Sequence, residues 1–527
     1  MAELKADYAT LPAIIDANGS ATFAELDAQS ANLARSLLAA GVSKGARIGI
    51  LMPNGQDYLV ALFAALRIGA VAVLVSTLAR PPELAQMIRV ADVDILLSAD
   101  HYLRNDYCTL LEAALPDLAT SQSDRRLALM GAPFLRAIWI WGKHHPAWAR
   151  SGTKAVAESQ DQSDINAEFL LAAQNEIVPA DPALIIFTSG SSAEPKAVVH
   201  SQANVVRQGK ALAELMGGCG PGDKLLSTMP FFWVGGLCTV VLAALCSGTA
   251  VICPSDPSTE ATMAALRKHD ATHIMHWPQQ LDLMKDDPEF REMLSRMRPA
   301  YAHQYELFDL VPTELNANTI GMTETLGPHH MLPLGALPKE KIGSYGTPVS
   351  GIEHRIIDPE TGEDMPTGEL GQLCLRGGSL LTGMHRKQHH EVFDERGFYR
   401  TDDVARVDDD GHIFFAGRGD DIVKISGANV SPVEVEGAIR ELDGVKAVCV
   451  VGLTPEGNEI TLAAAIIPED GASLDADAMR AQLKQRLSSY KVPRHYVMLR
   501  EDELPMTASA KIYKPALKEL LLERISG

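Results

Sequence analysis

Strand-like apolar runs alternate with helix-like segments through the first half of the chain, and this alternation most constrains the fold. The runs are 46–52, 71–75, 184–187, 224–229 and 250–253. Helices are predicted between them, at about 56–68, after Ser201 and from Leu237. Because strands that are apolar on both faces are typical of parallel sheets covered by helices, we predict an α/β fold of stacked, mostly parallel sheets.

The first long helix carries its own start and stop signals. Thr22 and Glu25 have the spacing of a capping box, and apolar residues follow at Leu26, Leu33 and Leu37. Gly41 stands where a left-handed C-terminal residue is expected. The segment 121–174 is less regular, and we interpret it as an insertion or surface excursion.

The 527 residues are too many for one ordinary core, so more than one structural unit is expected. We predict a large N-terminal domain at 1–417, whose last part, about 351–417, is a β-rich subdomain of short strands. A small, mobile α+β domain is predicted at 418–527. Within it, 445–451 and 460–467 are expected as strands and 475–487 as an amphipathic helix.

Net charge and apolar length argue against several partner classes. The formal charge of −20 repels phosphate backbones and anionic lipid, so neither nucleic acid nor a membrane surface is expected as the main partner. The uncharged stretch Gly235–Cys253 is interrupted by Ser247-Gly248, so we predict a buried helix and strand rather than a membrane span. Seven scattered cysteines without a CxxC pair, and no secretory signal at Met1–Thr10, indicate a cytoplasmic protein.

The motif FTSGSSAEPK, residues 187–196, follows an apolar strand. Its small residues allow the backbone to curl so that N–H groups face one anion, while hydroxyls and Lys196 add donors and charge. These are the properties of a triphosphate-binding loop, although a Ser/Gly-rich turn alone is more often only a turn. The motif is not a Walker loop, because the GK[ST] ending is absent.

Four further segments supply complementary groups. GMTET, 321–325, places a hydroxyl beside Glu324, whose carboxylate is suited to a magnesium ion that arrives with ATP. YRTDD, 399–403, offers a carboxylate for a ribose diol, and GRGDDIVKISG, 417–427, follows it. PMTASAKIYK, 505–514, presents Lys511, a point charge able to stabilise an anionic transition state.

In order and spacing these five segments resemble the adenylate-forming superfamily, in particular its AMP-forming acid–CoA ligases (acyl-CoA synthetases). The resemblance extends over nearly the whole chain, from the helix at Thr22 to Lys511. It implies ATP, a carboxylic acid and coenzyme A as substrates, with Mg²⁺ accompanying ATP.

The resemblance also implies roles for individual residues. The ATP-binding positions are Thr188, Ser189, Gly190, Ser191, Ser192, Lys196, Thr323, Glu324, Asp403, Arg418 and Lys511. Among them Lys511, Thr323 and Glu324 are the catalytic candidates, with Glu324 as the metal ligand. Asp420 matches the hinge about which the small domain rotates, and Gly427 matches the glycine turn beside the pantetheine tunnel of coenzyme A.

The acid-binding residues are assigned less completely. PFFWVGG, 230–236, matches the segment that lines the acyl site, so Trp233 and Gly321 are the acyl-site candidates and an apolar aliphatic, alicyclic or aromatic acid is expected. The residues His276, Trp277 and Gln279 are further candidates. The pair His329-His330 lacks zinc-site spacing and is expected to be solvated or pocket-lining.

The chain departs from the superfamily pattern at several points. Ser192-Ala193 replaces Thr-Gly, Asp402 replaces the glycine of Thr-Gly-Asp, and Ala510 replaces the glycine of Ser-Gly-Lys. The Gly-Gly-Ala-Pro segment that precedes the Thr-Glu motif is missing, and 301–318 occupies its interval without a glycine.

Alternative functions therefore stay open. They are an acyl-AMP ligase that loads a separate carrier protein, an oxidative luciferase-type relative, and a degenerate paralogue that binds nucleotide or acid without catalysis. The end of the sequence at Gly527, with no carrier domain after it, disfavours a multidomain peptide synthetase. A homodimer is a possible assembly.

Overall fold

The computed structural model of the chain describes residues 1–526 except 123–125, 161–163, 189–194, 217, 277–279, 282, 301–318, 333–338, 420–422, 426–427, 455–459, 488–490 and 507–511. The chain divides into two compact units. The first comprises Met1–Glu353 with Arg376–Tyr399, and the second comprises His354–Leu375 with Arg400–Gly527.

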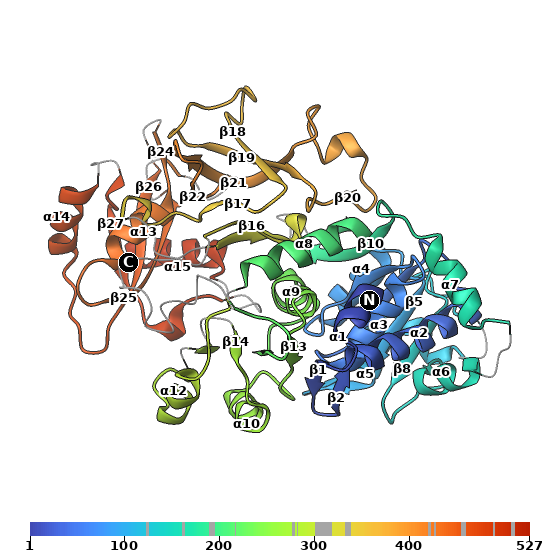
Figure 1. Cartoon of the computed structure of the whole chain (residues 1–527). Helices are drawn as coiled ribbons and strands as arrows, with labels where there is room; N and C mark the ends of the chain where they lie inside the picture. The colour runs from blue at the N-terminus through green and yellow to red at the C-terminus, as the bar shows by residue number, and fades with distance from the viewer. Residues whose placement is uncertain are drawn as a thin grey trace. The chain divides into compact units, whose positions relative to one another are not determined.

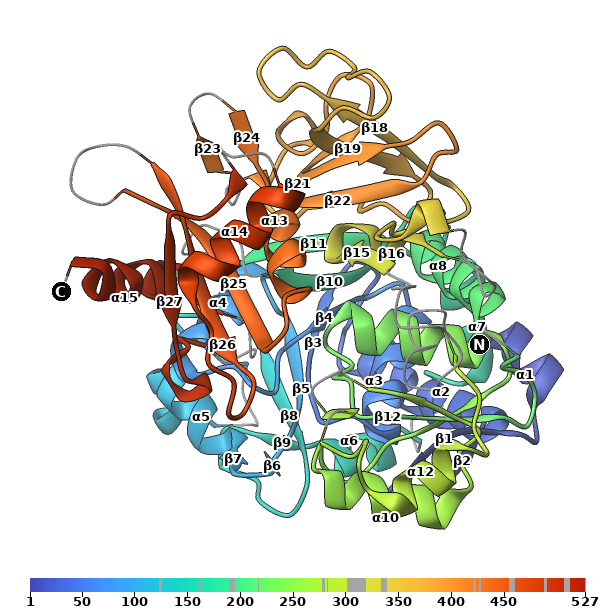
Figure 2. The ribbon, with the colours of Figure 1, turned by 90° about the vertical axis from the view of Figure 1, so that its left-hand side faces the viewer.

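Within the described part of the first unit, the largest sheet has eight strands (Figure 2). In spatial order they are β20 (Gly383–Met384), β11 (Lys196–Ser201), β10 (Pro182–Thr188), β4 (Val71–Leu74), β3 (Arg47–Leu51), β5 (Ile95–Ala99), β8 (Ala137–Trp141) and β9 (Arg150–Ser151). From β10 to β9 the strands run parallel, whereas β11 is antiparallel to both β10 and β20.

A second sheet of the first unit has five strands among the described residues. Its order is β14 (His273–Met275), β12 (Lys224–Ser227), β13 (Ala250–Ile252), β1 (Pro12–Asp16) and β2 (Gly19–Thr22). All neighbouring pairs are parallel except β1 and β2, which form a hairpin.

Helices cover both sheets (Figure 1). Their bounds are α1 (Ala2–Tyr8), α2 (Phe23–Ala39), α3 (Gln56–Leu66), α4 (Pro81–Val90), α5 (Tyr107–Ala114), α6 (Gly152–Gln160), α7 (Ala167–Asn175), α8 (Gln202–Leu215), α9 (Ala243–Cys246), α10 (Thr259–His269) and α12 (Pro288–Leu294). The α3 helix contacts strands of both sheets, and α4 and α5 pack against each other. Ile48 and Leu97 point into the core shared with α2 and α3, whereas Leu51 and Leu96 point into the core shared with α4 and α5. The larger sheet is therefore buried on both faces, as predicted.

Local sequence signals correspond closely to the observed boundaries. Thr22 and Glu25 form both hydrogen bonds of the capping box at the start of α2. Gly41, just after that helix, has φ +78°. Ser201 caps α8 by accepting from the N–H of Asn204. The helix predicted from Leu237 begins at Gly235 as a π-helix, η2 (Gly235–Leu242), which continues into α9.

The interpretation of 121–174 as a surface excursion is wrong. This segment supplies β8 and β9 of the eight-stranded sheet and the helices α6 and α7. Trp139 and Trp148 are only 1% and 3% exposed, so they belong to the core. The polar tract that follows β8 and β9 made the segment look irregular in the sequence. Burial of the tryptophans could not be read from the sequence, because it depends on how the sheet packs.

A small three-stranded sheet of the first unit lies at the Thr-Glu motif. It contains β15 (Thr319–Met322), β16 (Gly327–Met331) and β17 (Thr347–Pro348). A single 3-10 turn, η4 (Thr323–Thr325), links β15 to β16 and contacts both β10 and β11. The first unit thus brings the loop hairpin and the Thr-Glu turn together.

The second unit contains mainly antiparallel sheets. Strands β18 (Ile352–Ile357), β19 (Gly371–Gly377), β21 (Tyr399–Val407) and β22 (Ile413–Arg418) form one sheet. Residues 352–353, 376–377 and 399 of these strands are assigned to the first unit. Further along the chain lie β23 (Val423–Ile425), β24 (Ala428–Val430), α13 (Pro432–Arg440), β25 (Val445–Leu453), β26 (Thr461–Pro468), α14 (Ala476–Arg486), β27 (His495–Met498) and α15 (Lys514–Ser526). The β-rich character of 351–417 and the later strand and helix predictions agree with these elements.

Much of the predicted β-rich subdomain falls in the same compact unit as the predicted C-terminal domain. Residues 354–375 and 400–417 belong to the second unit, so this division differs from the predicted boundary at 417/418. The strand β22 packs against α13, which follows that boundary, and Ser431 donates a hydrogen bond to the carbonyl of Ala416. The position of a functional hinge at Asp420 stays a prediction.

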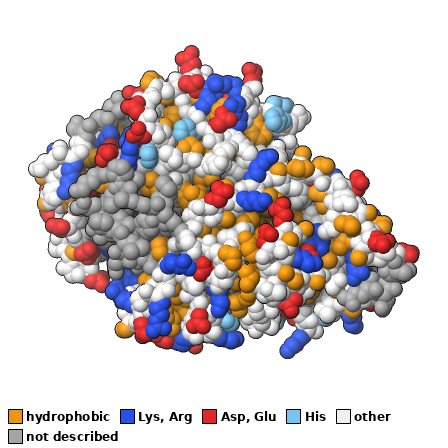
Figure 3. All heavy atoms as spheres, in the orientation of Figure 1, with side chains coloured by type: hydrophobic (Ala, Val, Ile, Leu, Met, Phe, Trp, Pro, Cys, Tyr) orange, Lys and Arg blue, Asp and Glu red, His pale blue; other side chains and the backbone are white. Residues whose placement is uncertain are grey.

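Surface charge is mixed on the face shown in Figure 3, where acidic and basic side chains are interspersed. In the part of the chain that the structure describes, no helix is long and apolar enough to cross a bilayer.

Candidate active site

The β10–β11 hairpin holds both ends of the predicted phosphate loop. Thr188 and Lys196 are register partners across the two antiparallel strands, and both are half-buried. The loop positions Ser189, Gly190, Ser191 and Ser192 lie outside the described residues. Pairing of the strands therefore sets a hydroxyl and an ammonium group at the two ends of one short connection.

The Thr-Glu turn is attached to this hairpin through a buried histidine. His200 on β11 is fully buried, and its Nε2 lies 2.7 Å from the carbonyl oxygen of Thr323. Burial lowers the pKa of His200 to about 4, so its ring is neutral near pH 7. Because a carbonyl only accepts, Nε2 must carry the proton of this hydrogen bond.

Glu324 is a buried carboxylate with well-defined partners. It is 8% exposed, and the hydroxyl of Tyr399 donates to its Oε1 at 3.3 Å. Its backbone carbonyl accepts from the N–H of Leu381 at 2.6 Å. Burial of a carboxylate is costly unless polar partners or a cation compensate it. Its oxygen chemistry fits Mg²⁺, which is commonly bound through one or two carboxylates together with substrate phosphates.

Asp403 and Arg418 form a second group of predicted residues, in the second unit. They are register partners on β21 and β22, and Arg418 Nε lies 3.1 Å from Asp403 Oδ1. The Asp403 side chain is 6% exposed, whereas that of Arg418 is 56% exposed. The Thr401 hydroxyl accepts from the Asp403 N–H at 3.1 Å. The carboxylate is thus positioned by the strand, while the guanidinium remains accessible.

The aromatic segment 230–236 is tightly packed. Phe231 packs edge-on to Tyr58, and its N–H donates to Asn54. Trp233 is half-buried and packs against Phe232 with ring centroids 5.0 Å apart. A Cβ on Gly236 would lie 2.1 Å from the carbonyl oxygen of Pro230, so the turn into η2 requires glycine. π-helical turns such as η2 are frequent at functional sites.

Gly321 contributes to the same region through strand pairing. It lies on β15 where the register with β16 shifts, and an added Cβ would approach the Gly327 carbonyl oxygen to 2.5 Å. In turn, β16 contacts η2. The two acyl-site candidates, Trp233 and Gly321, are therefore connected through β16 and η2.

His276 forms a polar cluster at the end of β14. Its Nδ1 lies 2.6 Å from the hydroxyl of Thr228 and 3.0 Å from Oε1 of Gln280. Burial lowers the pKa of His276 to about 4. Trp277 and Gln279, the neighbouring acid-site candidates, lie outside the described residues.

Comparison with known proteins identifies the family. Residues 3–385 match the model of the AMP-binding enzyme family, and residues 434–511 match the model of the AMP-binding enzyme C-terminal domain. The chain belongs to the AMP-binding enzyme family. The superfamily predicted from the five motifs is thereby confirmed, as is its enzyme class, an AMP-forming ligase.

Members of this family with similar sequences include ligases for different acids. The sulfoacetate–CoA ligase of Cupriavidus necator is 26% identical over 95% of this chain and 92% of its own length. The 3-hydroxybenzoate–CoA/4-hydroxybenzoate–CoA ligase of Thauera aromatica is 28% identical over 97% and 94% of the two chains. ATP-bound MatB from Rhodopseudomonas palustris has the same fold, with a TM-score of 0.80, 23% identity and coverage of 99% and 98%.

The histidine pair of this AMP-binding enzyme is buried, so the solvated alternative is wrong, whereas the pocket-lining alternative stays a prediction. His329 and His330 are both fully buried on β16, with their Nδ1 atoms 2.6 Å apart. Pairing of β16 with β15 and β17 removes them from solvent. Within the described residues, no group of three or more His, Cys, Asp and Glu side chains is arranged to hold a metal.

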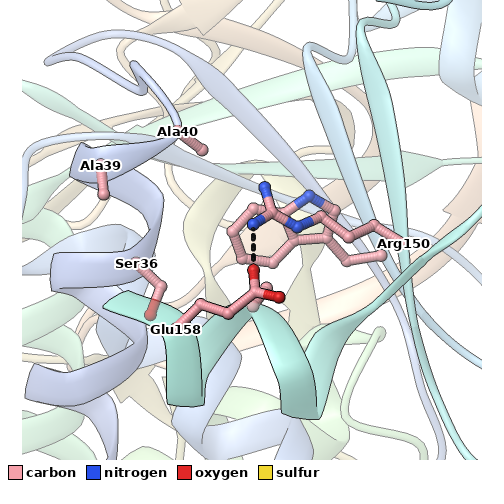
Figure 4. A pocket seen from close by; sticks show the side chains of 7 residues that line it. Ser36, Ala39, Ala40, Arg150 and Glu158 are labelled. Atoms are coloured by element: carbon pink, nitrogen blue, oxygen red, sulfur yellow. Dashed lines mark hydrogen bonds and ion pairs between the residues drawn. The ribbon is translucent and has the colours of Figure 1, made fainter. Parts of the chain in front are cut away.

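A small pocket lies elsewhere in the first unit of this AMP-binding enzyme (Figure 4). Its lining residues are Ser36, Ala39, Ala40, Trp139, Arg150, Ala155 and Glu158. Glu158 closes it on one side through an ion pair of 2.8 Å to Arg150. Its volume of about 60 Å³ is small beside ligand pockets of roughly 300–1,000 Å³. None of its lining residues belongs to a predicted motif, so the pocket is separate from the candidate active site.

Three predicted residues of the second unit, Asp420, Gly427 and Lys511, lie outside the described residues, as does 301–318 in the first unit. Sequence reasoning did not assign roles to His200 or Tyr399. The signal for His200 is a polar residue directly after the apolar run Ala197–Val199, whereas nothing local distinguishes Tyr399.

Proposed function

We propose that this chain is an acid–CoA ligase that activates a carboxylic acid with ATP and transfers the acyl group to coenzyme A. The observation that carries the proposal is the contact between η4 and the β10–β11 hairpin. It joins the hairpin that carries Thr188 and Lys196 to the Thr323-Glu324 turn, with His200 of β11 bonded to the Thr323 carbonyl. Hydroxyls, an ammonium group and a carboxylate are thus carried on elements that contact one another, and these are the groups needed to bind a metal-bound triphosphate.

In the first step, one oxygen of the acid's carboxylate attacks the α-phosphorus of ATP. The bond from that phosphorus to the oxygen bridging to the β-phosphate breaks, and pyrophosphate leaves. Thr188 and Lys196 bind the departing phosphates, while Thr323 orients the α-phosphate and the carboxylate in line. Lys511 stabilises the negative charge that develops at the α-phosphate.

Glu324 is the proposed ligand for Mg²⁺ carried by ATP. The bound ion supplies charge neutralisation of the phosphates. The contribution of the protein is the orientation of the carboxylate: Tyr399 holds Oε1, and the Leu381 N–H holds the backbone carbonyl of the same residue.

In the second step, the sulfur of coenzyme A attacks the acyl carbonyl carbon, the bond from that carbon to the AMP oxygen breaks, and AMP leaves. We propose that the Asp403 carboxylate accepts from the ribose hydroxyls and that Arg418 lies beside it. Rotation about Asp420 replaces Lys511 with the Gly427 turn at the site.

The acid is proposed to be apolar, because the half-buried Trp233 and the buried aromatic rings of Phe231 and Phe232 form the segment assigned to the acyl site. Relatives of this chain act on acids as different as sulfoacetate and hydroxybenzoates. The acid is therefore to be identified by comparing the rates of the chain with different apolar acids.

We also propose that the protein is located in the cytoplasm and that it forms a homodimer. Support for a reducing compartment comes from the seven cysteines, none of which forms a disulfide bond in the described structure. Sedimentation of the purified chain over a range of concentrations tests the dimer.

A panel of aliphatic, alicyclic and aromatic acids with ATP, Mg²⁺ and coenzyme A tests the activity. Release of AMP together with a thioester is the expected result for at least one acid. Accumulation of acyl-AMP with coenzyme A ignored would favour a carrier-protein loader. Light emission or oxidation would favour a luciferase-type relative, and binding of nucleotide without turnover would favour the degenerate paralogue.

Lys511→Ala separates the two steps. The variant is expected to lose adenylate formation and to retain thioester formation from supplied acyl-AMP. Arg524→Ala, a change of an exposed cation on α15, is the matched control and is expected to leave both steps intact. Equal loss of both steps in Lys511→Ala would sink the domain-rotation model.

A further inference from the structure

Three buried polar side chains follow one another at intervals of four residues from β11 into α8. His200, Asn204 and Gln208 are 0%, 4% and 1% exposed. Residues four apart lie on the same side of a helix, so Asn204 and Gln208 share the buried face of α8, and His200 immediately precedes its N-cap. We call these three residues the carbonyl-binding row.

Each member of the row donates to a main-chain carbonyl near the Thr-Glu turn. His200 Nε2 lies 2.7 Å from the Thr323 oxygen, and Gln208 Nε2 lies 2.9 Å from the Pro328 oxygen. Asn204 Nδ2 donates to the Leu380 oxygen. The next residue, Leu381, donates its N–H to the Glu324 oxygen. The row therefore binds the backbone before Glu324, at Thr323, and after it, at Pro328. It also binds the Leu380 carbonyl, next to the Leu381 N–H that is bonded to Glu324.

Core stability alone does not explain these residues. Two acceptors of the row, His200 Nδ1 and Gln208 Oε1, are buried and have no hydrogen-bond partner among the described residues. Unpaired buried acceptors are unfavourable, so the row carries a cost in stability beside the donors that satisfy three main-chain carbonyls. Because these carbonyls adjoin Glu324 or a segment bonded to it, the same donors also fix their positions.

We propose that the carbonyl-binding row positions Thr323 and Glu324 for Mg-ATP, an inference that rests on the proposed function. His200, Asn204 and Gln208 are positioning residues: they contact the backbone and act through Glu324. All three side chains project from β11 and α8. They therefore fix the position of the η4 turn, which carries Glu324, relative to β11, the strand that follows the phosphate loop.

The test compares His200→Leu with His200→Gln, because the glutamine Nε2 can reach the position of the histidine Nε2. Binding of Mg-ATP is measured by titration calorimetry, which needs no knowledge of the acid. His200→Leu is expected to weaken binding about tenfold, about 1.4 kcal/mol. Restoration to within about threefold is expected in His200→Gln. Unchanged binding in His200→Leu, or equal weakening in both variants, would overturn the inference.

Gln208→Met gives an independent test if His200→Leu does not fold. It keeps length and removes the amide, and it is expected to weaken Mg-ATP binding about threefold, about 0.7 kcal/mol. The matched control is His273→Gln, a change of an equally buried histidine on β14 of the other sheet. Weakening by the control equal to that by Gln208→Met would overturn the inference in favour of general destabilisation.

A double-mutant cycle shows whether the row acts through Glu324. In a Glu324→Gln background, His200→Leu is expected to change Mg-ATP binding by less than about twofold, because the group that it positions is already altered. Full additivity of the two changes would overturn the positioning role. Absence of Mg-ATP binding by the unmodified chain would instead overturn the proposed function, and the inference with it.

Discussion

The hydroxyl of Tyr399 lies 3.3 Å from Oε1 of Glu324, and both side chains are buried. The two residues are 75 positions apart in the sequence. Tyr399 begins β21, the strand that also carries Asp403. One tyrosine thus supports the proposed metal ligand at the start of the strand that bears the proposed ribose ligand.

Tyr399→Phe removes only the hydroxyl that orients Glu324. Hydrogen bonds to charged groups contribute about 1.5–3 kcal/mol, so a rise of about tenfold in the Mg²⁺ concentration for half-maximal adenylation is expected. Pyrophosphate–ATP exchange measures it. Tyr58→Phe is the matched control, because the buried Tyr58 hydroxyl has no hydrogen-bond partner in the described part of the chain. An unchanged magnesium requirement in Tyr399→Phe would contradict the role.

Asp403→Asn separates nucleotide binding from stability. The partly exposed Arg418 makes their ion pair worth only about 0–1 kcal/mol to folding, so the unfolding temperature is expected to change by no more than a few degrees. The KM for ATP is expected to rise about tenfold or more, because the amide is a poorer acceptor for ribose hydroxyls. Thermal unfolding and initial rates measure the two effects. A large fall in unfolding temperature with unchanged KM would reverse the assignment.

Gly321→Ala tests the close approach of β15 and β16. Its Cβ would lie 2.5 Å from the Gly327 carbonyl oxygen, and backbone cannot move aside as a flexible side chain can. A loss of about 1–3 kcal/mol in the free energy of unfolding is expected. Gly383→Ala on β20 is the control, since an added Cβ there meets no atom within 4 Å. Urea unfolding of the two variants measures the difference, and equal stability would contradict the predicted clash.

His276→Asn tests the acid sensitivity of the first unit. The folded-state pKa of His276, about 4, lies below its ordinary value of 6.5. Between these values the unfolded chain binds a proton that the folded chain does not, so stability falls as pH falls through this window. Removal of the imidazole should reduce the stability lost between about pH 7 and about pH 5 by roughly 2 kcal/mol. Urea midpoints at both pH values measure it, with exposed His145→Asn as control. An unchanged pH dependence in His276→Asn would exclude His276 as the titrating group.

Much of the candidate site could be proposed from the sequence because its motifs are contiguous. Thr188 and Lys196 flank one loop, and Thr323 and Glu324 are adjacent, so each local group is visible before folding. Contacts between residues that are far apart in the sequence could not be predicted in this way. Tyr399 and His200 contact the Thr-Glu turn across 75 and 123 positions respectively. His200 stands out locally only as a polar residue after an apolar run, and nothing local distinguishes Tyr399.

The sequence by itself indicated several helix boundaries, the parallel character of the buried strands and the chemical groups proposed to bind ATP. Capping of α2 by Thr22 and burial of Ile48 follow from short-range hydrogen bonding and from apolar character, both of which are local properties. Tertiary structure alone decided that Trp139 is core and that His329 and His330 are removed from solvent. It also decided that His200 holds the carbonyl of Thr323. These outcomes depend on which strands and helices meet, and the free energy of such contacts exists only once distant segments have packed together.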